Sequence, residues 1–152
     1  MITSNIMKLV GDAMKARDSV RVSVLRMLSS ELKNAKINIH DPNATEQREL
    51  TEAEEIAVVR REAKKRKEAI EMYEKVNAID KVESEKAELL ILQEFLPAEV
   101  SEEEVNKLIS ESIDNLKATS LQDMGKVIAD VKLKNSGVDG SVVANLVRSK
   151  LS

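Results

Sequence analysis

Hydrophobic residues recur at spacings of three and four along most of the chain, which is the period of an amphipathic helix. In the first two thirds, these stripes predict helices over residues 4–17, about 18–37, 51–75 and 80–96. Residues 38–50 lose the period and contain the turn signature Asp41-Pro42-Asn43. We therefore expect an exposed loop between the second and third helices.

Helix start signals accompany this pattern. A Ser, Thr or Asp followed three residues later by an acidic residue resembles a capping box, in which each side chain bonds the other residue's backbone N–H. Four such pairs occur: Thr51 with Glu54, Asp80 with Glu83, Ser101 with Glu104, and Ser120 with Asp123. Thr3 or Ser4 is expected to cap the first helix, and Asp139 the last.

The segment Leu89–Val105 divides the chain. Its apolar helix end runs into Pro97, which disfavours helix for the preceding residue and cannot donate a backbone hydrogen bond. A new helix is predicted to start at the Ser101 cap. We therefore expect a boundary between residues 1–97 and 98–152.

The second part predicts three further helices, from Ser101 to Leu116, from Ser120 through Val131, and from Asp139 to Leu151. Val138 and Val143 are spaced as a hydrophobic staple at the start of the last one. The break before it, residues 135–137, ends in a glycine that can take a left-handed conformation without penalty.

Composition fits an all-α fold. Of 152 residues, 34% are charged, and the four Gly and two Pro are too few for a sheet with many turns. Hydrophobic residues make up 42% but aromatic ones only 1%, so the core must be aliphatic.

Several function classes are excluded or disfavoured. The absence of cysteine excludes disulfides, thiolate metal sites and cysteine nucleophiles. No signal peptide or membrane-spanning run is visible, so we expect a cytoplasmic protein that does not enter a membrane. The net charge of −3 argues against broad binding to nucleic acid but leaves local basic patches open.

No catalytic constellation, metal site or cofactor motif is predicted. His40 is the only histidine, and its place in the expected loop favours an exposed residue over a general base. The carboxylates mostly alternate with Lys and Arg on predicted helices, as in solvated faces with i,i+4 pairs. No phosphate-cradling glycine loop is present.

The densest basic stretch lies in the third predicted helix and would form a stripe about two turns long. Such a stripe can track a phosphate backbone, although acidic neighbours favour a neutralised, solvated face. Its members are Arg60, Arg61, Lys64, Lys65 and Lys67.

The presence of Gly125 inside a predicted helix needs an explanation, because glycine there costs about 1 kcal/mol of helix stability relative to alanine. Two compatible reasons are open. Gly125 lets two helices pack closely, which we favour, or it lets another molecule's backbone approach beside Lys126.

Four strings resemble the YqeY family, small stand-alone proteins related to the C-terminal tail of the GatB subunit of tRNA-dependent amidotransferases. The resemblance covers nearly the whole chain. This sequence departs from the family pattern at Ile79, where an arginine often follows Ala78, and near Asp130-Val131, where Met-Pro often stands. The strings are RVSVLRMLSSELKNAKI (21–37), REAKKRKEAIEMYEKV (61–76), AELLILQEFLPAEVSEEEV (87–105) and DMGKVIADVKLKNSGVDGSVVANLV (123–147).

The resemblance implies a four-helix domain followed by a three-helix domain. In the amidotransferase, the tail helps to hold tRNA while other domains perform the carbon–nitrogen ligation with glutamine as amido-nitrogen donor, and those domains are absent here. It therefore implies a non-catalytic module that binds tRNA or associates with amidotransferase or aminoacyl-tRNA synthetase components. The expected RNA-binding residues are Gly125, Lys126, Lys132, Lys134, Gly140, Arg148 and Lys150.

Two other hypotheses belong to different classes. A protein–protein interaction module without a nucleic-acid role fits the negative net charge and the lack of aromatic residues for stacking on bases. An enzyme that transfers amide nitrogen alone would need a glutaminase nucleophile, and neither a cysteine nor a serine–lysine arrangement is recognisable.

Overall fold

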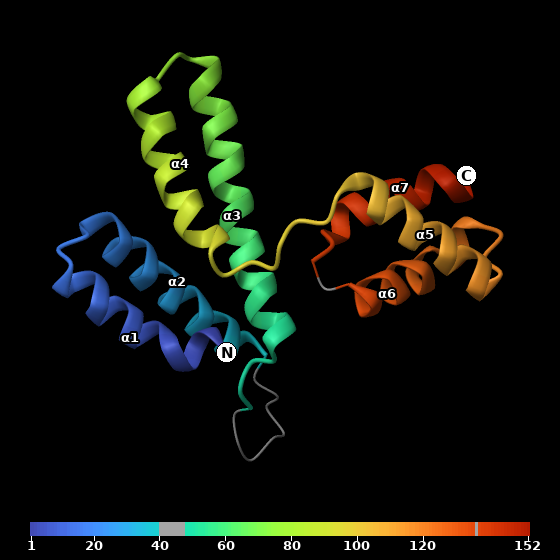
Figure 1. The fold of residues 1–152 in the computed structure, drawn as a ribbon, viewed down its shortest axis with the longest axis horizontal. Helices are drawn as coiled ribbons and strands as arrows, with labels where there is room; N and C mark the ends of the chain where they lie inside the picture. The colour runs from blue at the N-terminus through green and yellow to red at the C-terminus, as the bar shows by residue number, and fades with distance from the viewer. Residues whose placement is uncertain (40–47, 136) are drawn as a thin grey trace. The chain divides into compact units, whose positions relative to one another are not determined.

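The structure is a computed structural model that describes residues 1–39, 48–135 and 137–152 (Figure 1). The described residues form α-helices and one short 3-10 helix, η1, without any strand, so the predicted all-α class is confirmed. The chain divides into two compact units, Met1–Leu96 and Pro97–Ser152. The helices are α1 (Ile2–Lys15), α2 (Ser19–Asn38), α3 (Glu52–Lys75), α4 (Ile79–Gln93), α5 (Glu102–Leu116), η1 (Leu121–Asp123), α6 (Met124–Lys134) and α7 (Gly140–Leu151).

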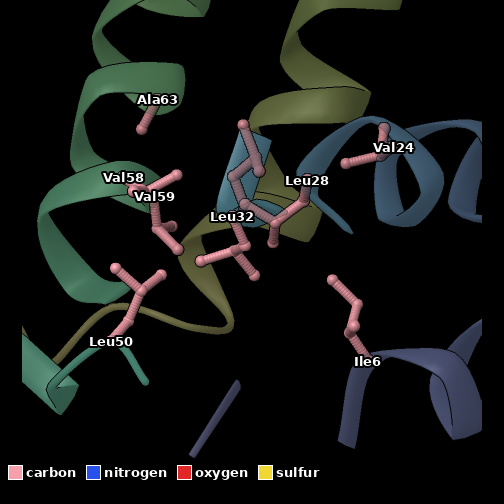
Figure 2. Close-up of a cluster of buried hydrophobic side chains, with 9 residues drawn as sticks. Ile6, Val24, Leu28, Leu32, Leu50, Val58, Val59 and Ala63 are labelled. Atoms are coloured by element: carbon pink, nitrogen blue, oxygen red, sulfur yellow. The ribbon is translucent and has the colours of Figure 1, made fainter. Parts of the chain in front are cut away.

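The first unit consists of two helical hairpins, α1 with α2 and α3 with α4 (Figure 1). Helix α2 contacts both α3 and α4 and so joins the hairpins. Figure 2 shows the aliphatic side chains of α1, α2 and α3 gathered in the main core. Its buried members are Ile6, Val24, Leu28, Leu32, Leu50, Val58, Val59, Ala63 and Leu92.

Three turns follow α1, α3 and α5 with a non-glycine residue in the left-handed region: Arg17 (φ 57°), Asn77 (φ 53°) and Lys117 (φ 52°). After each one, the next N–H bonds a carbonyl five residues back, as Asp18 N–H does to Ala13 O at 3.0 Å. This is the Schellman closure of a helix end, which satisfies carbonyl groups that the helix leaves free.

The helix starts agree with the capping prediction in part. Thr51 and Glu54 form the predicted capping box, and the Ser101 hydroxyl and the Asp139 carboxylate each accept an N–H from the first turn of their helices. The prediction for α1 is wrong. That helix begins at Ile2 without a side-chain cap of its own, because a carboxylate from α3 bonds its first amides.

Helix α4 also differs from prediction at both ends. It begins at Ile79 after Ala78, so Asp80 is a first-turn residue rather than the cap, where its charge still favours the helix N-terminus. It ends at Gln93 instead of Leu96. The Leu96 N–H donates to Gln93 O, which closes a turn tighter than that of an α-helix. The chain thereby leaves the helix before Pro97.

The second unit packs α5, α6 and α7 around a core that is largely valine. Val138 and Val143 both belong to this core, as the staple spacing predicts. Gly137 is not left-handed, contrary to the expected use of that glycine. Glycine is required at this position for a steric reason, because a Cβ there would lie 2.8 Å from the carbonyl oxygen of Ala98.

The expected loop is only partly described. His40 and the Asp41-Pro42-Asn43 turn fall in residues 40–47, outside the described part of the chain. Among the described helices, none combines the length and the apolar character that crossing a membrane would require.

Candidate nucleic-acid interface

Helix α6 carries three of the predicted lysines in its eleven residues, and all three are exposed. Lys126 and Lys134 lie two turns apart on the same side, with Asp130 between them at i,i+4 spacing. Lys134 Nζ is 3.0 Å from the Asp130 carboxylate, to which the buried Ser112 hydroxyl of α5 donates a hydrogen bond at 2.6 Å.

The Asp130 carboxylate is therefore held in its charged form. The Ser112 hydroxyl and then the Lys134 ammonium lower the pKa of Asp130 below its usual range. Because Asp130 pairs with Lys134, it offsets part of the positive charge on this side of α6. Sequence reasoning missed this role, although an acidic residue four positions before a lysine on a helix is the signal that could have found it.

At the start of α6, Asp123 accepts the backbone N–H groups of Thr119 at 3.0 Å and Ser120 at 3.3 Å. These two bonds, and then the charge of Lys126, lower the pKa of Asp123. Asp123 thereby fixes the turn from which Lys126 projects into solvent.

Beside Lys126, Gly125 is exposed and faces open space. A Cβ built there would meet no atom within 4 Å outside its own helix neighbourhood. The favoured explanation for this glycine, close packing of two helices, is therefore wrong within this unit. The other explanation, approach of another molecule, stays a prediction.

Lys132 and Gly140 come together where α6 ends and α7 begins. A Cβ on Gly140 would lie 2.7 Å from Lys132 Nζ, so the lysine side chain occupies the space that the glycine leaves. Lys132 forms no ion pair with the described residues. Its ammonium group thus lies beside the first residue of α7, the helix N-terminus that the Asp139 carboxylate caps.

The two remaining predicted cations, Arg148 and Lys150, lie in the last turn of α7. Lys150 Nζ bonds the hydroxyl of Ser110 on α5 at 3.0 Å. The predicted residues are therefore not one cluster. They occupy the start of α6, the α6–α7 junction and the end of α7.

The basic stripe of α3 is largely neutralised within the first unit. Arg61 lies 3.5 Å from Glu31, and Lys65 lies 2.8 Å from Glu62, a carboxylate that is 3% exposed. Arg60 and Lys67 also have interaction partners. Lys64 forms no ion pair with the described residues, but the pairs of Arg61 and Lys65 favour the interpretation of a neutralised face.

The described carboxylates do not gather as a metal site would require. Among the described residues, no three His, Cys, Asp or Glu side chains lie close enough to hold an ion. The two most buried carboxylates, Glu55 and Glu62, are engaged with backbone amides and with Lys65 respectively.

Comparisons with known proteins agree with the strings quoted above. No curated protein matches the chain. A family model described as Yqey-like protein matches residues 3–151, which is nearly the whole sequence. Since the match spans both units, the chain belongs to the YqeY family.

Proposed function

We propose that the protein is a non-catalytic accessory factor that binds tRNA through its second unit. The observation that carries this proposal is the exposed Lys132, which lies beside the first residue of α7 and forms no ion pair with the described residues. A lysine ammonium attracts phosphate groups. Membership of the YqeY family, with its likeness to the GatB tail, supports tRNA as the source of the phosphates.

The open face at Gly125 supports the same proposal. A helix surface without a Cβ lets a sugar–phosphate backbone come closer to the helix than any other residue would permit. Lys126 then lies beside the approaching chain. Amidotransferase and aminoacyl-tRNA synthetase components are the protein partners that this proposal implies.

The test is fluorescence anisotropy of labelled bulk tRNA at several salt concentrations. Replacing Lys126, Lys132 and Lys134 with Ala should weaken binding and reduce the slope of log K against log salt by roughly 2 to 3. The matched control replaces Lys8, Lys33 and Lys107, three exposed lysines elsewhere, and removes the same charge. Equal effects of the two triple variants, or no binding by the natural protein at low salt, would exclude this site.

A protein-interaction module is the second candidate, and one observation favours it. The end of α3, the following turn and the start of α4 carry three exposed apolar side chains, Met72 (65% exposed), Val76 (68%) and Ile79 (70%). Apolar side chains gathered in this way favour contact with another protein. A partner recovered in stoichiometric amount after nuclease treatment, and lost on Met72→Ser with Ile79→Ser, would favour this function.

A further inference from the structure

A hollow of about 480 Å³ lies at the turn between α1 and α2, and none of its lining residues is among the predicted RNA-binding residues. This volume falls within the range of small-molecule sites. Four residues of α2 line it, at the spacing i, i+3, i+4, i+7 that places them on one face. The lining consists of Met14, Arg17, Ser19, Val22, Ser23 and Arg26.

The lining is basic and contains no carboxylate. The nearest acidic residue in sequence, Asp18, caps α2 by accepting the Arg21 N–H at 2.9 Å and is not part of the lining. The lining therefore includes two arginines, Arg17 and Arg26, and no anion.

Both arginines lack the partners that others in this unit have. Arg21, Arg48 and Arg61 each pair with a glutamate at 2.6–3.5 Å. Arg17 and Arg26 form no ion pair with the described residues, and the Arg26 guanidinium donates only to the sulfur of Met14, at 3.7 Å. A thioether is a weak acceptor, so the donors of Arg26 remain available for a stronger one.

The backbone keeps Arg17 at this site. It occupies the left-handed position of the Schellman turn after α1, where a non-glycine residue is strained. Its N–H bonds Met14 O at 3.1 Å, which fixes the residue at the corner of the hairpin beside the first turn of α2. The strain is therefore observed at a residue that lines the hollow.

The other lining groups fit a ligand with a polar and an apolar end. The Ser19 and Ser23 hydroxyl groups form no hydrogen bond with the described residues and can donate to an oxyanion. Met14 and Val22 supply an apolar wall beside them.

We propose that this hollow binds the phosphate group of an organic phosphate, with Arg17 and Arg26 on the phosphate and Met14 and Val22 against the organic part. Guanidinium groups match phosphate oxygens in geometry and charge. The phosphate belongs either to a free nucleotide or to an RNA chain, and the site is independent of the proposed tRNA contacts on α6.

The test is an NMR titration of the full chain with adenosine monophosphate, with inorganic phosphate and with adenosine. We expect saturable shifts of the α1–α2 turn amides with the nucleotide, weaker ones with phosphate, and none with adenosine. Arg17→Gln with Arg26→Gln should raise the nucleotide Kd by at least about tenfold. Ser23→Glu, which adds a carboxylate to the lining, should do the same without removing a native charge.

The control variant, Lys8→Gln with Lys33→Gln, removes the same charge from exposed positions of the same hairpin and should leave the Kd unchanged. A parallel titration with tRNA distinguishes the two sources of the phosphate. If the site binds an RNA chain, tRNA shifts the same amides and adenosine monophosphate does not. The proposal is overturned if neither ligand shifts these amides, or if the arginine variant and the control bind alike.

Discussion

The carboxylate of Glu55, a fully buried residue of α3, accepts hydrogen bonds from the backbone N–H groups of Ile2 at 2.7 Å and Thr3 at 2.9 Å. These amides belong to the first turn of α1 and have no partner inside that helix. The negative charge also lies at the positive end of the α1 dipole. One side chain, more than fifty residues away in sequence, thus caps the first helix and ties the two hairpins of the first unit together.

Replacing Glu55 with Ala should therefore destabilise the first unit by about 2 to 4 kcal/mol, because two amides lose a charged acceptor and a cavity remains. Glu55→Gln retains one acceptor oxygen and should cost less, about 1 to 2 kcal/mol. Urea unfolding followed by the fluorescence of Tyr73, the only tyrosine in a chain without tryptophan, measures this unit. A loss for Glu55→Ala no greater than that of exposed Glu52→Ala, within about 0.5 kcal/mol, would contradict the capping role.

Glu54 should make the free energy of unfolding of the first unit depend on pH in the acidic range. Two hydrogen bonds from Arg48, and then the Thr51 N–H, lower its pKa from 4.5 to about 2. The unfolded chain binds the proton at higher pH than the folded one, so the stabilisation is complete above pH 4.5 and is lost as pH falls towards about 2.

We therefore expect the free energy of unfolding of the natural protein to fall more steeply over this pH range than that of Glu54→Gln. Urea unfolding at several pH values, again followed by Tyr73, checks this. Glu52→Gln removes an exposed carboxylate of the same helix turn and should keep the natural slope. Parallel pH profiles for Glu54→Gln and the natural protein would show that the Arg48 pair contributes nothing.

The sequence predicted the helices well because their signals are local. Thr51 with Glu54, Ser101 and Asp139 act within one turn of their own helix, and the structure contains all three. Hydrophobic periodicity likewise identifies the residues that form the core.

What the sequence did not reveal depends on contacts between distant segments. Glu55 stands in a run of alternating charges that is typical of a solvated face, and only the fold brings it to Ile2. Arg17 and Lys117 end their helices in the left-handed conformation, which is usually taken up by glycine. The residue types at these positions therefore did not predict the turns. The same holds for the α6 site. Lysines were visible in the sequence, but the pairing of Asp130 with Ser112 needed the α5–α6 contact.

Gly125 and Gly137 should respond oppositely to alanine. Gly125→Ala meets no atom within 4 Å and should stabilise the second unit by about 0.5 to 1 kcal/mol, through lower entropy of the unfolded chain. Gly137→Ala places a Cβ 2.8 Å from Ala98 O and should destabilise it by about 1 to 3 kcal/mol. Hydrogen exchange of the α6 and α7 amides measures this unit.

The Gly125 variant also separates stability from binding. If a sugar–phosphate backbone approaches this face, Gly125→Ala should bind tRNA more weakly although the protein is more stable. Unchanged tRNA affinity in the more stable variant would mean that nothing approaches the helix at Gly125.

Asp130 provides the converse test, because removing it should improve binding. Asp130→Asn keeps an acceptor for the Ser112 hydroxyl but releases Lys134 from its ion pair. The Lys134 ammonium then becomes available to a phosphate, so we expect tRNA affinity to rise about twofold to fivefold at low salt. Anisotropy titrations across salt concentrations should also give a steeper slope, by at most about 0.9.

The matched control is Asp114→Asn, which removes an exposed carboxylate from α5 without releasing a lysine from an ion pair among the described residues. If general charge were the cause, both variants would gain equally. A gain confined to Asp130→Asn places Lys134 at the RNA contact, whereas equal gains or none would remove Lys134 from the proposed interface and leave Lys126 and Lys132 as its only cations on α6.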